Sequence, residues 1–276
     1  MSPEELYIGG GFDIFHPDHR KFIAGSYEIA KKDYPIRRIV IGLLADEELT
    51  LRGSHRPLFP YEWRRDDVLQ WFASRPFLGV EGVVEKTYRE DFYKGIHREL
   101  FAQRVVVINS DHKNKHWIKK IREWHPRIQF VEPIGRFHTT DILNEVQKVG
   151  ERSRCLYRKV GALLIRNGEI VASGTNGPGN DGSCEDCSKY ESMMENFEKT
   201  GKIELSPVSC DYAHAEMKCL PYSQSGDDIL ATIGPCPRCA DEIVKHNIRR
   251  VVYLSPHSNP LSIDIFNNNG IQHRLA

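Results

Sequence analysis

Short apolar runs alternate with longer amphipathic stretches along the first half of the chain. The apolar runs lie at 6–8, 39–44, 105–108 and 128–131, and helical patterns lie at 17–32, after Pro60 and at 113–124. Runs of this length predict buried strands, and strands that alternate with helices indicate a parallel sheet wound on both faces. We therefore predict an α/β domain with a doubly wound parallel sheet, whose ligands lie at the carboxyl ends of the strands.

A second pattern begins near residue 150. A helix whose start is capped near Thr139 continues towards Arg154. Beyond it, apolar residues at 160–165 and 169–172 flank Asn167-Gly168, a dipeptide that favours a hairpin turn. A chain of 276 residues also exceeds the usual size of a single core. We expect two domains, which span 1–150 and 151–276.

Composition narrows the class of protein. Hydrophobic residues make up 40% of the chain and charged residues 28%, as in an ordinary globular protein. Lys+Arg and Asp+Glu both number 38, so the basic surplus typical of proteins that bind nucleic acids is missing, and small-molecule partners are favoured. No run of about 18 apolar residues predicts a membrane span.

The amino terminus and the cysteines indicate a compartment. Residues 1–5 are acidic rather than basic and then apolar, so they do not resemble a secretory signal. All seven cysteines lie at or beyond Cys155, and an odd number confined to one half suits metal ligands and free thiols. We expect a reducing, cytoplasmic location.

Two short motifs in the second half carry the chemistry. They are His214-Ala215-Glu216 and Pro235-Cys236-Pro237-Arg238-Cys239. A catalytic zinc takes three protein ligands and keeps one position open for water, which His214, Cys236 and Cys239 would satisfy. Two cysteines three apart in the first turn of a helix face the same way, and the positive helix end favours their thiolates.

Glu216 follows the histidine at a spacing that suits a proton carrier. Zinc lowers the pKa of bound water from about 15.7 to roughly 7, and Glu216 would move protons from that water to the ring nitrogen and the leaving ammonia. A lone C-x-x-C also fits structural zinc or a redox pair, and a lone H-x-E arises by chance. The two motifs together, in this order, are the signature of zinc nucleobase deaminases.

The second half of the chain resembles a known family. Residues 151–276 resemble the cytidine and deoxycytidylate deaminase superfamily through the two motifs, the segment Ser153–Ala162 and the loop Gly174–Gly177. The resemblance implies an α/β/α fold, a cytosine nucleotide of the dCMP type as substrate, and a homo-oligomer. It also implies that Asn176 contacts the sugar hydroxyl; a plain turn residue is the alternative.

Three further cysteines form a separate candidate site. Cys184 and Cys187 make another C-x-x-C, and Cys210 lies shortly before His214. Some members of the resembled family carry a second, structural zinc in this region, and a long polar segment would gain order from such a clip. The alternative is three free thiols. Cys155 and Cys219 are expected to be packing residues.

A glycine- and histidine-containing segment follows the first predicted strand. Its residues are Gly10, Gly11, Phe12, Asp13, His16 and His19. Glycines let the backbone approach an anion, and two histidines three apart at a helix start point the same way beside the positive helix end. The segment therefore predicts a triphosphate cradle, although a lone H-x-x-H also arises as a metal pair or by chance.

Residues 6–146 resemble the cytidylyltransferase-like nucleotidyltransferases, which carry two histidines after a strand. This resemblance implies a Rossmann-like fold and use of CTP or ATP with Mg²⁺. The residues it brings forward for nucleotide binding are Arg52, Arg56, Arg65, Asp111, Thr139 and Thr140. Two departures stand out: Asp18 replaces the usual glycine between the histidines, and His138 stands where a small residue is usual.

We interpret the chain as a bifunctional enzyme of nucleotide metabolism. The first domain would transfer a nucleotidyl group to a phosphorylated small molecule and release pyrophosphate, and the second would deaminate a cytosine nucleotide. One alternative is a deaminase with a non-catalytic nucleotide-sensing domain. The other is a deaminase that edits cytosine or adenine in nucleic acids, which the balanced charge disfavours.

Overall fold

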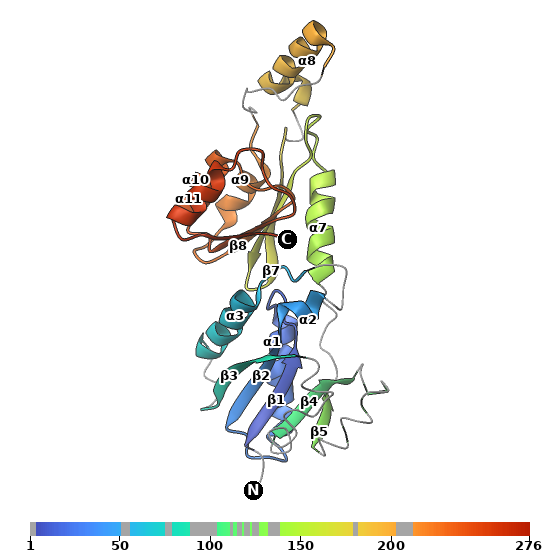
Figure 1. Ribbon diagram of the computed structural model, residues 1–276, viewed down its shortest axis with the longest axis vertical. Helices are drawn as coiled ribbons and strands as arrows, with labels where there is room; N and C mark the ends of the chain where they lie inside the picture. The colour runs from blue at the N-terminus through green and yellow to red at the C-terminus, as the bar shows by residue number, and fades with distance from the viewer. Residues whose placement is uncertain are drawn as a thin grey trace. The chain divides into compact units, whose positions relative to one another are not determined.

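The chain folds into two compact units, Met1–Thr139 and Thr140–Ala276. The computed structural model describes residues 4–50, 56–74, 79–88, 104–110, 113–114, 118, 122, 127–131, 139–178, 182–202 and 212–276 (Figure 1). We expected the division near 150, on or just after a helix. Contacts divide the chain before that helix, α7 (Thr139–Glu151), which packs within the second unit.

The first unit contains the predicted parallel sheet. Its strands are β1 (Glu5–Gly10), β2 (Arg38–Leu44), β3 (Glu81–Thr87), β4 (Arg104–Asn109) and β5 (Ile128–Val131), in the order β3-β2-β1-β4-β5. All neighbouring strands pair in parallel, which confirms an α/β fold with a parallel sheet. The order reverses at β1, and ligands of such sheets bind in the crevice at that point.

Strand β3 was missed in the sequence. Charged residues at both its ends hide the short apolar centre Val83-Val84, and its place at the sheet edge leaves it partly exposed. Within the described residues, α1 (Pro17–Ala30) and α3 (Tyr61–Ser74) cover one face of the sheet, where Ile23 and Trp71 join the core. The helix expected at 113–124 lies mostly outside the described residues.

A buried arginine ties together the loops above the sheet. The Arg64 side chain is fully buried and donates to the carbonyls of Gly11, Leu44 and Phe59. It also forms an ion pair with Asp46 in the short helix α2 (Asp46–Thr50). The ends of β1 and β2 are therefore held together by one guanidinium.

We predict that Arg64→Met destabilises the first unit by about 3 to 5 kcal/mol, because it leaves a carboxylate and three carbonyls without their donor. Arg65→Met is the matched control: Arg65 is exposed and pairs with Asp66, so its loss should change stability by less than about 0.5 kcal/mol. Urea unfolding followed by tryptophan fluorescence measures this unit alone, since all four tryptophans precede residue 139. Equal stability of the two variants would contradict the role of Arg64.

The second unit holds a mixed five-stranded sheet. Its strands are β6 (Gly161–Arg166), β7 (Glu169–Thr175), β8 (Asp228–Ala231), β9 (Arg250–Tyr253) and β10 (Gln272–Leu275), in the order β10-β9-β8-β6-β7. Strands β6 and β7 form the predicted antiparallel hairpin, and its turn residues Asn167 and Gly168 both have positive φ. Strands β8, β9 and β10 run parallel.

Helices complete the second unit. They are α7, α8 (Ser188–Thr200), α9 (Ala215–Cys219), α10 (Pro237–Lys245) and α11 (Leu261–Asn268), with 3-10 turns η2 (Cys184–Asp186) and η3 (Leu220–Tyr222). Helix α7 lies close to β6 because two glycines face each other: a Cβ on Gly161 would come within 2.5 Å of the Val146 carbonyl and 2.4 Å of the Gly150 nitrogen. Cys219 is buried in the core, as expected.

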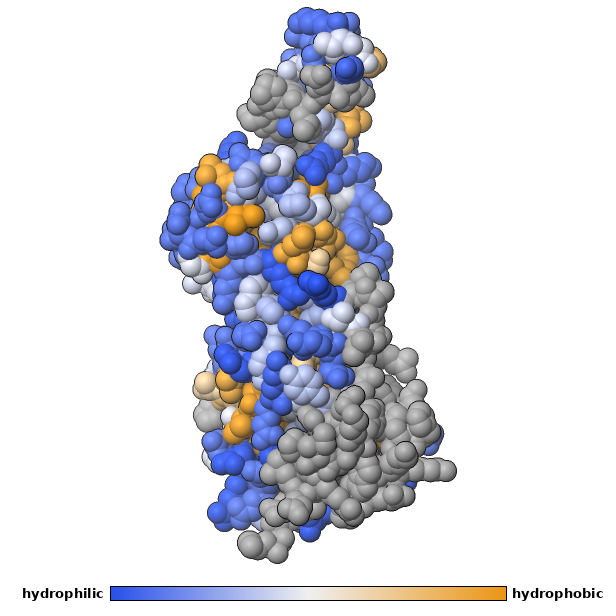
Figure 2. Space-filling view, viewed as in Figure 1, coloured by the Kyte–Doolittle hydropathy of each residue, from blue (hydrophilic) through white to orange (hydrophobic). Residues whose placement is uncertain are grey.

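None of the helices in the described residues has the length and apolar character needed to cross a membrane. Hydrophilic residues cover most of the described surface visible in Figure 2, and apolar residues form small separate patches.

Candidate functional site

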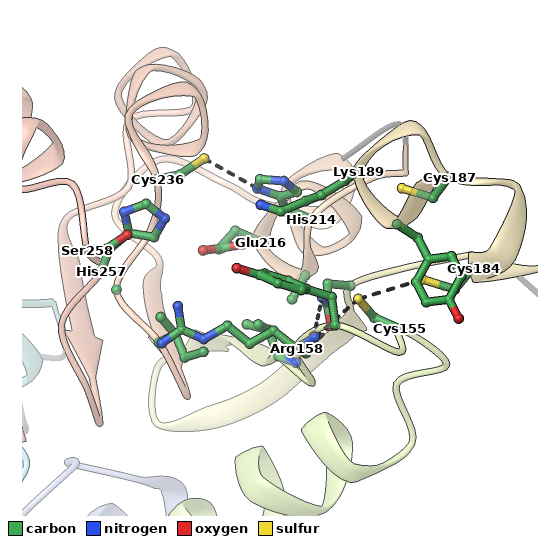
Figure 3. A pocket seen from close by; sticks show the side chains of 17 residues that line it. Cys155, Arg158, Cys184, Cys187, Lys189, His214, Glu216, Cys236, His257 and Ser258 are labelled. Carbon is green, nitrogen blue, oxygen red and sulfur yellow. Dashed lines mark hydrogen bonds between the residues drawn. The ribbon is translucent and has the colours of Figure 1, made fainter. Parts of the chain in front are cut away.

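Three side chains from two helix starts meet in the second unit. His214 is the N-cap of α9, and Cys236 is the N-cap of α10. Cys239 is the third residue of α10, which begins at Pro237. The His214 Nδ1 atom lies 3.3 Å from the Cys236 sulfur and 3.2 Å from the Cys239 sulfur. The structure thus brings together the three residues that the sequence motifs predicted as metal ligands (Figure 3).

The donor set fits a tetrahedral zinc ion. Zinc–sulfur bonds of about 2.3 Å and zinc–nitrogen bonds of about 2.0 Å place tetrahedral donors about 3.5 Å apart. The observed nitrogen–sulfur distances of 3.2 and 3.3 Å are close to that value, and all three ligand atoms lie within 4.8 Å of one another. Only a small outward movement of the side chains is needed to hold the ion.

Proton affinities in the cluster are strongly shifted. The hydrogen bond from Cys239 lowers the pKa of the Cys236 thiol to about 3, and the same bond raises the pKa of Cys239. The hydrogen bond to Cys236 raises the pKa of the His214 imidazole. A thiolate beside an imidazole is a ready ligand pair for a divalent cation.

Glu216 lies beside the cluster without joining it. Its side chain is 3% exposed, and the Cys239 sulfur is 3.7 Å from its Oε2 atom. Burial raises the pKa of the Glu216 carboxyl above its usual range. A carboxyl beside a set of candidate metal ligands can accept a proton from water and release it again during hydrolysis.

The cluster opens into a pocket of about 210 Å³. Figure 3 shows His214, Glu216 and Cys236 on its wall together with Arg158, Lys189 and His257. Glu216 is the only acidic residue among the described residues that line this pocket. Arg158 and Lys189 therefore outnumber the acidic side chains on this wall.

Asn176 lines the pocket, but its amide is bonded to the protein. The Oδ1 atom accepts from the Val160 amide and the Ser153 hydroxyl, each at 2.7 Å, and Nδ2 donates to the Arg158 carbonyl at 2.6 Å. These bonds join the loop after β7 to the segment that leads into β6. A contact between Asn176 and a sugar hydroxyl stays a prediction, and one Nδ2 hydrogen remains for it.

The thiols expected to form a second site are partly brought together. Cys184 and Cys187 are buried in one cluster with Cys155, and the Cys155 and Cys184 sulfurs are 4.0 Å apart. Cys210 lies outside the described residues. We expected Cys155 to be a packing residue; it is buried, and its sulfur also lies beside the Cys184 thiol, which accepts from the Leu156 amide.

Sequence reasoning did not single out Arg158, Lys189 and His257 as pocket residues. His257 follows β9, and the carboxyl end of a parallel strand is a general signal for ligand contact. Arg158 precedes β6 within a segment already recognised. The sequence contains no signal that Lys189 lines the pocket, because the position of its side chain depends on the turn at η2.

In the first unit, the two histidines of the H-x-x-H motif are in contact. His16 is the N-cap of α1, and the centroids of the His16 and His19 rings are 3.9 Å apart. Burial lowers the pKa of His16 to about 4 and that of His19 to about 3, so both rings are neutral. The Asp18 carboxylate lies 3.6 Å from the Lys21 ammonium.

The other residues expected to bind nucleotide occupy varied environments. Both Asp13 carboxylate oxygens accept from backbone amides, of Leu58 and Phe59, so this side chain holds a loop. Gly10 ends β1, and the buried Phe12 has a positive φ of 48°. Arg65 is exposed and paired with Asp66, which fits a surface charge.

For the remaining nucleotide-binding candidates, the structure describes few side-chain contacts. Arg56 is exposed, and Gly11 accepts from Arg64. Thr139 and Thr140 open α7, although their side chains are outside the description. Arg52 and Asp111 also lie outside the described residues, so their roles stay predictions.

An imidazole, two thiols and a buried carboxyl above an α/β sheet are the groups of the zinc-dependent nucleobase deaminases. The family model for the cytidine and deoxycytidylate deaminase zinc-binding region matches residues 138–255. The deoxycytidylate deaminase of Mycobacterium phage D29 is 31% identical over 108 residues, which are 37% of this chain and 83% of the relative. That of Enterobacteria phage T2 is 26% identical over 165 residues, 48% and 88% of the two chains.

This chain belongs to the cytidine and deoxycytidylate deaminase zinc-binding family. Among solved structures, the dCMP deaminase from the cyanophage S-TIM5 in complex with dCMP and dUMP is similar, with 21% identity and a TM-score of 0.40. That match covers 51% of this chain and all of the other. The family match begins at residue 138 and so leaves residues 1–137 unassigned.

We predict that Asn176→Ala destabilises the second unit by about 1 to 3 kcal/mol, because the Val160 amide and the Arg158 carbonyl lose their partner, while the Ser153 hydroxyl keeps the backbone carbonyl of residue 176. Thermal unfolding and hydrogen exchange of residues 153–160 measure the effect. Asn269→Ala removes a single exposed hydrogen bond to Ile265 and serves as the control. If Asn176→Ala were as stable as the wild type and only KM rose, the side chain would act on substrate rather than on the loop.

Proposed function

We propose that the second unit is a zinc-dependent deaminase that hydrolyses the exocyclic amine of a cytosine nucleotide of the deoxycytidylate type. The observation that carries this proposal is the His214, Cys236 and Cys239 cluster with the buried Glu216 beside it at the end of a pocket. The deoxycytidylate deaminases among the relatives support the choice of substrate.

The reaction replaces the C4 amine of cytosine with oxygen from water and releases ammonia. Zinc, when bound by the three ligands, supplies a Lewis acid that activates water. Glu216 accepts a proton and delivers protons to ring nitrogen N3 and to the departing amine. Burial raises the pKa of this carboxyl, which favours its use as a proton carrier.

Replacement of Glu216 separates catalysis from metal binding. We expect Glu216→Gln to lower ammonia release from dCMP by about 10² to 10⁴-fold, because the proton carrier is lost. The variant should keep its zinc, whereas Cys239→Ala should lose both zinc and activity. Ammonia assays and elemental analysis give the two readouts, and Glu198→Gln, exposed on α8, is the control. Full activity of Glu216→Gln would refute the proposal.

We further propose that the first unit binds CTP or ATP with Mg²⁺ and transfers a nucleotidyl group to a phosphorylated small molecule. Support comes from the paired imidazoles at the start of α1, directly above the reversal of strand order. The Asp18 amide donates to His16 Nδ1, so the neutral ring carries its hydrogen on Nε2 and can donate it to a phosphate oxygen.

Strain in the same loop adds to that support. Phe12 and Ile14 both adopt positive φ, at 48° and 52°, and Ile14 is β-branched. Backbone strain of this kind costs about 1 to 3 kcal/mol per residue and concentrates at functional sites. The alternative is a nucleotide-sensing unit without chemistry, which would use the same cradle.

We expect His16→Ala to abolish pyrophosphate release from CTP or ATP in a screen of phosphorylated acceptors, because a donor to the α-phosphate is lost. Lys21→Ala, on the same helix and exposed, should behave as the wild type. If His16→Ala altered only the nucleotide dependence of ammonia release, the sensing alternative would replace transfer.

A further inference from the structure

One lysine side chain joins the helix that carries Glu216 to the loop after β7. Lys218 lies in α9, and its backbone amide donates to the carbonyl of His214 at 3.3 Å. Its Nζ atom donates to the carbonyl of Gly177 at 3.1 Å. Lys218 itself does not line the pocket, so any effect that it has on the reaction must pass through the groups that it holds.

The stem of this lysine follows the loop from its start. A Cβ on Gly174 would come within 3.0 Å of the Lys218 Cβ atom, so the side chain leaves α9 beside Gly174 and its ammonium ends at Gly177. Gly177 has a φ of 87°, and a Cβ there would come within 3.0 Å of the Cys155 backbone nitrogen. The loop is thus in close contact with Cys155 as well as with Lys218.

Asn176, the pocket residue of this loop, is bonded to a different part of the chain. Its side chain joins the Val160 amide and the Arg158 carbonyl, and its own carbonyl accepts from the Ser153 hydroxyl. All these partners belong to the segment that leads into β6. Among the hydrogen bonds of the described residues, the one from Lys218 joins the loop after β7 directly to α9.

That bond affects the geometry that deamination needs. Helix α9 carries Glu216 and begins at His214, whereas Asn176 sits on the loop, so the spacing between helix and loop decides whether one substrate can reach both. A displacement of about 1 Å can cost roughly 100-fold in rate. A hydrogen bond from an ammonium is stronger than one from a neutral donor, which suits it to fix this spacing.

We propose that Lys218 is a positioning residue that keeps Asn176 in register with His214 and Glu216. This inference rests on the proposed deaminase function and on the predicted contact of Asn176 with a sugar hydroxyl. In a deoxycytidylate the 3′-hydroxyl is the only free hydroxyl of the sugar. Lys218 therefore acts on the use of that hydroxyl, whereas a residue that only stabilised the fold would affect every substrate alike.

The test compares ammonia release from dCMP and from 2′,3′-dideoxycytidine 5′-monophosphate, which lacks the 3′-hydroxyl, by the zinc-loaded protein. We expect the wild type to prefer dCMP in kcat/KM by about 5 to 10-fold, the size of one hydrogen bond. Lys218→Met keeps the stem beside Gly174 and loses the ammonium. It should lower kcat/KM for dCMP by about 5 to 10-fold and leave the dideoxy substrate within about twofold.

The ratio of the two substrates does not depend on how much of a variant is folded, because the same enzyme sample turns over both. An equal loss on both substrates, or no loss on either, would overturn the role of Lys218. A wild type without preference for dCMP would overturn it as well, since no hydroxyl contact would then exist for Lys218 to support.

Further variants show whether the effect passes through the loop. Lys218→Arg keeps a charged donor and should retain at least about half of the preference for dCMP. In an Asn176→Ala background, Lys218→Met should lower the preference no further, because both changes remove the same contact. Lys245→Met is the matched control: Lys245 is exposed on α10 and pairs with Glu242, so this variant should behave as the wild type.

The two proposals fail in different ways. If the wild type deaminates dCMP and Lys218→Met keeps the full preference, the deaminase stands and the role of Lys218 fails. If the wild type releases no ammonia, the deaminase function fails, and calorimetric binding of dUMP and its 3′-deoxy analogue then tests Lys218. A preference for dUMP that Lys218→Met loses would support the role, and a preference that it keeps would overturn it.

Discussion

The convergence of two helix starts is the constraint on which the deaminase centre depends. His214 caps α9, and Cys236 caps α10, so the ligand atoms meet only if both helices begin at the same end of the sheet. Gly174 of β7 makes this approach feasible, because a Cβ there would come within 2.2 Å of the Ala215 carbonyl in α9. The close contact between the backbones of β7 and α9 thus helps to position the candidate metal ligand His214.

The pocket is lined by two chemically different kinds of side chain. The first kind is the set of candidate metal ligands with Glu216 beside it: burial raises the pKa of the Glu216 carboxyl, and the hydrogen bond from Cys239 lowers the pKa of the Cys236 thiol. The second kind is the pair of cationic side chains Arg158 and Lys189, with Lys189 over the ring of Tyr157, which packs against buried thiols. Asn176 connects the two, since its amide fixes both the loop after β7 and the segment that carries Arg158.

The first unit shows how a fold can be stabilised by the groups that flank its candidate site. Arg64 and Asp13 spend their hydrogen bonds on backbone atoms of the loops above the sheet. The two imidazoles lie in contact beside these loops, and burial lowers the pKa of both. Arg64 and Asp13 thus hold the loops around the two histidines through backbone hydrogen bonds.

The sequence by itself determined the features that depend on neighbours along the chain. The hairpin at Asn167-Gly168, the alternation that gives a parallel sheet, and the motif spacings of His214, Cys236 and Glu216 follow from local geometry. Only the tertiary structure decided which distant side chains share a wall. Lys189 joins Arg158 in one pocket, and Cys155 meets Cys184, through chain reversals that no periodicity encodes. The sequence did not predict edge strand β3 or the burial of Arg64 for the same reason. Burial depends on residues far apart in the chain, and the charge of a residue does not reveal it.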